Sequence, residues 1–143
     1  MTPVKAETKR RAAIEKRPRA ATLVTGGTGF LGSHLVRQLI AEGAKDIRVM
    51  ATSIPDWLVD LGVETFEGSI TKESDVKRAV DGIGEIYHLA GKVSRERDDA
   101  REMYKVHVEG TRLLCDAAKA ADVKTIVLAS TSGTIAVTDG FNP

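Results

Sequence analysis

Short apolar runs alternate with amphipathic stretches from residue 21 to the end of the chain. The runs predict strands at residues 21–25, 46–52, 63–68, 84–91 and 123–130. The stretches between them predict helices at residues 30–43, 54–62, 71–82 and 98–121. Because strands and helices alternate and the fifth strand is apolar on both faces, the pattern predicts an α/β fold with a parallel sheet covered on both sides.

Single residues predict how two of these helices begin, pack and end. Leu31, Leu35 and Leu39 recur at helical spacing and predict the buried face of the first helix. Gly43 follows that helix and is its expected C-cap, because glycine adopts the left-handed conformation easily. Thr71 is the expected N-cap of the third helix.

Composition indicates one domain preceded by a charged segment. The chain has 143 residues, of which 42% are hydrophobic and 29% charged, which is ordinary for a single globular domain. Residues 1–20 are rich in charge and poor in large apolar side chains, so they predict a basic tail or a frayed helix ahead of a domain at residues 21–143. The net charge is +1 and Glu7 and Glu15 dilute the basic cluster, so nucleic acid is not expected as a partner.

Cysteine and histidine usage argues against disulfides and metal. Cys115 is the single cysteine of the chain, and the sequence brings no third ligand near His34 or His88. No apolar run is long enough to span a bilayer, and the first residues lack the apolar core of a signal peptide. We therefore expect a cytoplasmic protein without a metal site or a membrane partner.

The stretch TGGTGFLG, residues 25–32, joins the first strand to the first helix. A P-loop would need Lys and then Ser or Thr after its second glycine, where this chain has Ser33 and His34. A dinucleotide-binding turn needs one glycine for the tight turn, one for close approach of the pyrophosphate and one where helix meets strand, and Gly26, Gly29 and Gly32 fill these roles. The pattern favours a dinucleotide site, although glycine-rich turns also occur as plain connections.

The spacing Thr-Gly-x-x-Gly-x-x-Gly resembles the extended short-chain dehydrogenase/reductase family of sugar epimerases, dehydratases and dihydroflavonol-type reductases. VETFEGSIT, IYHLAG and VHVEGTRLLCDAAKAADVKTIVLASTSG resemble successive landmarks of that family in the right order, so the likeness covers about residues 21–138. It implies a Rossmann-type doubly wound parallel sheet of strand order 3-2-1-4-5, with this chain stopping after the fifth strand. It also implies hydride transfer to or from a nicotinamide cofactor.

The resemblance carries a set of cofactor-binding residues onto this sequence. The pyrophosphate would lie over the glycine turn at Gly26, Thr28, Gly29, Phe30, Leu31 and Gly32. The adenine would lie near Ser69 and Ile70, where the family usually has aspartate and an apolar residue. Leu89, Ala90 and Gly91 match the segment along the ribose and nicotinamide, although small residues there also suit simple packing.

The end of the second strand bears on coenzyme choice. An acidic side chain there would bind the ribose hydroxyls of NAD, but Thr52 and Ser53 occupy these positions. Since a carboxylate would repel the extra phosphate of NADP and hydroxyls can donate to it, NADP is slightly preferred over NAD. Arg37 or Arg48 would be the source of long-range cationic support.

The resemblance supplies one candidate catalytic group within these residues. Ser132 best matches the family's catalytic hydroxyl, with Thr131 and Ser130 as alternatives, although a Ser/Thr-rich turn can also simply end a strand. No tyrosine in the chain is followed four positions later by lysine, as the family's Tyr-x-x-x-Lys requires. We therefore expect the N-terminal portion of a longer enzyme, inactive alone, whose substrate is a small molecule chosen by residues outside this chain.

Two alternatives stay open at this stage. One is a non-catalytic NAD(P)-binding protein on the same fold that senses the redox state of the nucleotide. The other is a homodimer formed through helix 98–121, which resembles part of the family's dimer interface. Within that helix His107 stands where the family commonly has asparagine, which puts a proton relay in doubt and leaves either a hydrogen-bonding or a packing role.

Overall fold

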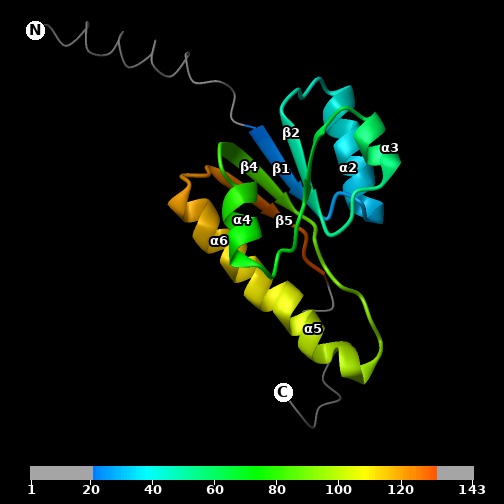
Figure 1. The fold of residues 1–143 in the computed structure, drawn as a ribbon, viewed down its shortest axis with the longest axis vertical. Coiled ribbons are helices and arrows are strands. Elements are labelled where there is room, and N and C mark those ends of the chain that lie inside the picture. The colour runs from blue at the N-terminus through cyan, green and yellow to red at the C-terminus, as the bar shows by residue number, and fades with distance from the viewer. Residues whose placement is uncertain (1–20, 132–143) are drawn as a thin grey trace, which may run out of the picture.

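The computed structural model describes residues 21–131, and these form a five-stranded parallel sheet. The strands are β1 (Ala21–Thr25), β2 (Ile47–Ala51), β3 (Glu64–Glu67), β4 (Ile83–His88) and β5 (Thr125–Leu128). They lie in the order β3-β2-β1-β4-β5, so the predicted fold class and strand order are confirmed (Figure 1). The order reverses beside β1, and in open parallel sheets such a switch point is where ligands bind.

Helices cover both faces of the sheet. They are α2 (Phe30–Ala41), α3 (Asp56–Asp60), α4 (Glu73–Ala79), α5 (Ala100–Tyr104) and α6 (Thr111–Ala120). Figure 1 shows α2 and α3 on one face and α4 and α6 on the other. Neighbouring residues of a strand point to opposite faces, so Leu23 packs in the cluster under α4 and α6 while Val24 packs under α2 and α3.

The stretch predicted as helix 98–121 is helical but not uniform. A 3-10 turn, η1 (Arg97–Asp99), leads into α5, and a π-helical segment, η2 (Lys105–Gly110), joins α5 to α6. Gly110 is buried, and a Cβ there would lie only 3.0 Å from Cγ2 of Ile70. The glycine therefore lets this helix pack close to the loop after β3.

The first helix ends as predicted but packs differently. Gly43 has φ of +85°, its N–H donates to the Ile40 carbonyl, and the next N–H, of Ala44, donates to the Leu39 carbonyl. This is a Schellman ending, which confirms the predicted cap. Leu31, however, is 58% exposed, so its place in the buried face was wrong. Leu35 and Leu39 do pack against the core cluster as predicted, beside Gly32 and Val36, which are the buried residues of α2.

Two further expectations are corrected. Thr71 does not cap α4, because that helix begins at Glu73 after Lys72 and the Thr71 hydroxyl lies 2.8 Å from the hydroxyl of Ser69. The fifth strand is not covered on both faces within residues 21–131, because Ile126, Val127 and Leu128 are 37, 43 and 54% exposed.

No helix in the described part of the chain is long and apolar enough to cross a membrane.

Candidate functional site

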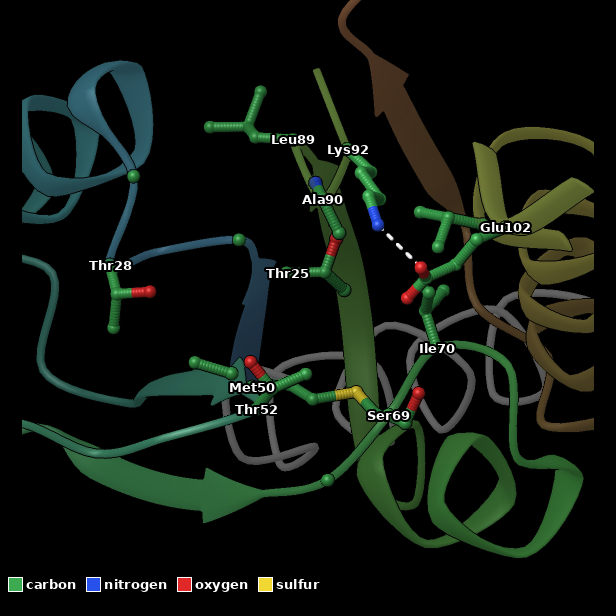
Figure 2. A pocket seen from close by; sticks show the side chains of 16 residues that line it. Thr25, Thr28, Met50, Thr52, Ser69, Ile70, Leu89, Ala90, Lys92 and Glu102 are labelled. Atoms are coloured by element: carbon green, nitrogen blue, oxygen red, sulfur yellow. Dashed lines mark hydrogen bonds and ion pairs between the residues drawn. The ribbon is translucent and has the colours of Figure 1, made fainter. Parts of the chain in front are cut away.

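A cleft of about 360 Å³ opens at the carboxyl ends of β1, β2 and β4. It brings together most of the predicted cofactor-binding residues, namely Gly26, Thr28, Gly29, Thr52, Ser69, Ile70, Leu89, Ala90 and Gly91. Figure 2 shows their side chains around one opening. Phe30, Leu31, Gly32 and Ser53 do not line it. Sequence reasoning missed seven lining residues, which are Thr25, Met50, Ala51, Gly68, Lys92, Glu102 and Val106.

Three of the four glycines in the turn, Gly26, Gly29 and Gly32, fill different physical roles. Gly26 has φ of +72°, and a Cβ there would lie 2.6 Å from the backbone nitrogen of Ala90. Gly32 is buried, and its Cβ would lie 2.2 Å from the carbonyl oxygen of Gly26. Gly29, the N-cap of α2, is exposed and would meet only that same oxygen at 3.3 Å. The turn is thus packed tightly inward and stays open at Gly29, beside the unpaired N–H groups that begin a helix.

The loop after β3 is held in place on the opposite side of the cleft. The backbone N–H of Ser69 donates to Asp75 Oδ2 at 3.0 Å, so the first turn of α4 fixes the loop. Ile70 is buried and packs against Gly110. Asp75 was not found from the sequence, because nothing local marks a carboxylate that bonds a backbone group six residues earlier.

A buried polar network joins the strands below the cleft. The Thr25 hydroxyl lies 2.7 Å from His88 Nδ1 and also accepts the N–H of Ala90 at 3.3 Å, while His88 Nε2 lies 3.0 Å from the Thr111 hydroxyl. A neutral imidazole has one N–H donor and one acceptor nitrogen, so His88 donates to one of these two hydroxyls and accepts a hydrogen bond from the other.

The environment keeps His88 neutral. The side chain is 2% exposed, and burial followed by the nearby charge of His107 lowers its pKa from 6.5 to about 4. The network ties β1, β4 and α6 to the loop that carries Ala90. His88 was considered from the sequence only as a metal ligand, because its partners lie 63 and 23 positions away.

Residues of η1, α5 and η2 hold the loop after β4 at the wall of the cleft. His107 Nε2 lies 2.8 Å from the carbonyl oxygen of Lys92 and 3.2 Å from its backbone nitrogen. A Cβ at Gly91 would approach the His107 ring to 2.9 Å, so this ring packs directly on the loop after β4. The side chain of Lys92 forms ion pairs with Asp99, at 3.1 Å, and with Glu102 (Figure 2). These pairs raise the pKa of Lys92, with Glu102 as the main cause.

The arginines expected to support NADP are engaged elsewhere. Arg48 donates to the carbonyls of Ala79 and Asp81, both at 2.8 Å, and its Nε lies 2.9 Å from Glu64. Arg37 lies over the Trp57 ring, 4.7 Å from its centroid. Neither lines the cleft, so this expectation is corrected, because both guanidinium groups already have partners on the outer elements.

The candidate catalytic hydroxyls lie only partly within the described residues. Ser130 and Thr131 are exposed residues just beyond β5 and do not line the cleft. Ser132 lies outside the described residues, so its role stays a prediction. Among residues 21–131, no group of three or more His, Cys, Asp or Glu is placed to hold a metal ion.

A parallel sheet, a glycine turn at its switch point and an open helix N-terminus together define a fold of the Rossmann type. The sequence model of the 3-beta hydroxysteroid dehydrogenase/isomerase family matches residues 23–140. The chain belongs to this family, and the predicted resemblance to extended short-chain dehydrogenases/reductases is confirmed.

Curated relatives agree with this assignment. Sterol demethylase protein B of Methylococcus capsulatus is 38% identical over 124 residues, which are 85% of this chain and 36% of that protein. A putative dihydroflavonol 4-reductase of Synechocystis is 34% identical over 80% of this chain and 33% of its own length. Mouse 3 beta-hydroxysteroid dehydrogenase type 7 is 33% identical over 70% of this chain and 29% of its own. The chain thus spans about a third of these relatives.

Solved structures show the same fold. A short-chain dehydrogenase/reductase superfamily protein from Agrobacterium tumefaciens with bound NAD superposes with a TM-score of 0.71 at 34% identity, covering 78% of this chain and 32% of that one. UDP-glucose 4-epimerase of Thermus thermophilus in complex with NAD gives 0.70 at 30% identity, covering 78% and 37%. These neighbours bind NAD at the fold that this chain shares.

Proposed function

We propose that this chain is the NAD(P)-binding portion of an oxidoreductase or epimerase of the extended short-chain dehydrogenase/reductase type. The observation that carries the proposal is the cleft over Gly26 and Gly29, where side chains are absent and Ala90 approaches the turn. The residues present suit a dinucleotide: N–H groups at the start of α2 for the pyrophosphate, and Ser69 with buried Ile70 for the adenine. A bound nicotinamide would supply hydride transfer.

NADP is the coenzyme that we favour. Thr52 lines the cleft at the end of β2 and is exposed, so no carboxylate opposes a 2′-phosphate at that position. The neighbours named above bind NAD, so a preference for NADP would distinguish this chain from them.

The reaction would involve a secondary alcohol and its ketone. Support comes from the sterol and steroid dehydrogenases and the dihydroflavonol reductase among the relatives. Ser132 would orient the substrate oxygen, and the Tyr-x-x-x-Lys pair would lie beyond Pro143. The single cysteine suits a reducing cytoplasm, and Tyr104 and Val108, exposed on helix 98–121, support a homodimer through that helix.

Coenzyme binding is tested with the purified chain by titrating NADPH and NADH and following energy transfer from Trp57, the only tryptophan. NADPH is expected to bind more tightly than NADH. Thr52→Asp should reverse this order, since a carboxylate repels the 2′-phosphate, while Ser74→Asp on the exposed face of α4 should leave it unchanged. Binding of neither nucleotide at millimolar concentration would overturn the proposal.

The enzymatic part is tested by reading the coding frame past Pro143. A continuation that contains Tyr-x-x-x-Lys supports an oxidoreductase or epimerase, in which Ser132→Ala should lower kcat. A stop codon directly after Pro143 would contradict it and leave a cofactor-binding role alone.

A further inference from the structure

Opposite charges meet in the cleft at a single place. Among the described residues that line it, Lys92 is the only basic one and Glu102 the only acidic one. They come from different elements, Lys92 from the loop after β4 and Glu102 from α5, and Figure 2 shows their ion pair on the helix side of the cleft. Asp99 of η1 holds the same ammonium group from outside the lining.

The backbone and the side chain of Lys92 differ in their freedom to move. His107 contacts both polar backbone atoms of Lys92, and its ring packs on Gly91, so the main chain there is anchored to η2. Among residues 21–131 the partners of the ammonium group are the two carboxylates, and the side chain of Glu102 is 62% exposed. Ion pairs with such exposed partners contribute little to stability, so the ammonium can exchange partners at low cost.

The rest of the cleft has no charged side chain to meet an anion. Thr28 offers a hydroxyl and the first residues of α2 offer backbone N–H groups, while Glu102 would repel a phosphate if Lys92 were not beside it. A dinucleotide that enters the cleft brings phosphate oxygens, which accept strong hydrogen bonds from an ammonium group.

We propose that Lys92 binds a phosphate group of the dinucleotide, and that Glu102 and Asp99 pair with its ammonium group when no nucleotide is bound. This rests on the proposed function, because it assumes that the cleft takes a dinucleotide. Binding then exchanges two carboxylate partners for phosphate oxygens, with no change in the backbone that His107 anchors. Glu102 thereby sets the affinity for nucleotide by competing for Lys92.

The two members of the ion pair should respond in opposite directions. Calorimetric titration of the purified chain with ADP should show about tenfold weaker binding for Lys92→Met and a few-fold tighter binding for Glu102→Gln. Lys92→Arg should retain most of the affinity because it keeps the charge. Adenosine, which has no phosphate, should bind all variants alike. Adenosine 2′-monophosphate serves as a third ligand. If Lys92→Met weakens the binding of ADP, Lys92 contacts the diphosphate. If it weakens only the binding of adenosine 2′-monophosphate, Lys92 contacts the 2′-phosphate.

A matched pair on α4 provides the control. Lys77 and Glu73 also form an ion pair, four residues apart on an exposed helix face and outside the cleft lining. Lys77→Met and Glu73→Gln should leave all three affinities unchanged, with thermal unfolding confirming that every variant is folded.

A purely structural role of the ion pair would give a different result. If the ion pair only held the loop against α5, Lys92→Met and Glu102→Gln would both weaken binding, and adenosine would be affected as much as ADP. That outcome would overturn the role proposed for Lys92, as would unchanged affinities of Lys92→Met for both phosphate ligands. The proposed function would stand in either case, because the unaltered chain would still bind nucleotide. Failure of the unaltered chain to bind any of the three ligands would instead overturn the proposed function as well.

Discussion

Gly26→Ala isolates the close approach between the glycine turn and the loop after β4. Gly26 has φ of +72°, and its Cβ would lie 2.6 and 2.7 Å from the nitrogen and Cα of Ala90. The left-handed conformation alone costs alanine about 1–2 kcal/mol. The contact is with backbone, which cannot rotate away, and forced overpacking adds about 1–3 kcal/mol. We therefore expect the free energy of unfolding to fall by about 2–5 kcal/mol.

Gly82→Ala is the matched control. Gly82 has the same φ of +72°, but a Cβ there would meet nothing within 4 Å. It carries the conformational cost alone, about 1–2 kcal/mol. The difference between the two variants is thus the steric contact with Ala90.

Urea unfolding, followed by Trp57 fluorescence and by circular dichroism, measures both values. The two probes should give coincident transitions. Equal destabilisation by the two substitutions, within about 0.5 kcal/mol, would refute the close packing of the turn on Ala90.

Three further predictions concern the groups around the cleft. The pKa of His88 in the folded chain, about 4, lies below the ordinary 6.5, so the unfolded chain binds the extra proton first as the pH falls. The contribution of His88 to the free energy of unfolding should be fully present above pH 6.5 and should fall by about 3 kcal/mol as the pH drops toward 4. Urea unfolding across this range should show a weaker pH dependence for His88→Asn. Thr25→Val, which removes the acceptor of the Ala90 N–H and the hydrogen-bond partner of His88 Nδ1, should lower the free energy of unfolding by about 1–3 kcal/mol in the same assay, and Thr25→Ser should restore part of it. Arg48→Lys should destabilise the chain by about 1–3 kcal/mol despite the retained charge, because one ammonium nitrogen replaces two separate guanidinium nitrogens, Nη1 at the carbonyls and Nε at Glu64. A urea midpoint within error of that of the unaltered chain would contradict this.

The fold and the glycine turn followed from the sequence because their signals are local. Apolar runs and helical periodicity lie within each element, and Gly29 and Gly32 would meet atoms that the motif itself places nearby. The order of the strands and the cleft residues at the strand ends came with the family resemblance. These residues lie together because the carboxyl ends of parallel strands meet at one edge.

The groups that were missed act between distant segments. The bond between Thr25 and His88 joins positions 63 apart, and Lys92 meets Glu102 only because helix 98–121 returns beside β4. Thr71 is a residue type that commonly caps helices. The backbone N–H of Ser69, however, donates to the Asp75 carboxylate, and α4 begins at Glu73, two residues after Thr71. Arg48 was misplaced for the same reason, because the sequence shows its charge but not the distant backbone carbonyls to which it donates.

The central claim is that the cleft between the glycine turn and the loop after β4 binds a dinucleotide. Titrating the 15N-labelled chain with NADPH and recording amide chemical shifts tests it residue by residue. The account predicts the largest shifts at Gly26, Gly29, Ile70 and Ala90, with little change on the outer face of α4. Shifts centred on α4 and α6, or none at saturating nucleotide, would contradict it.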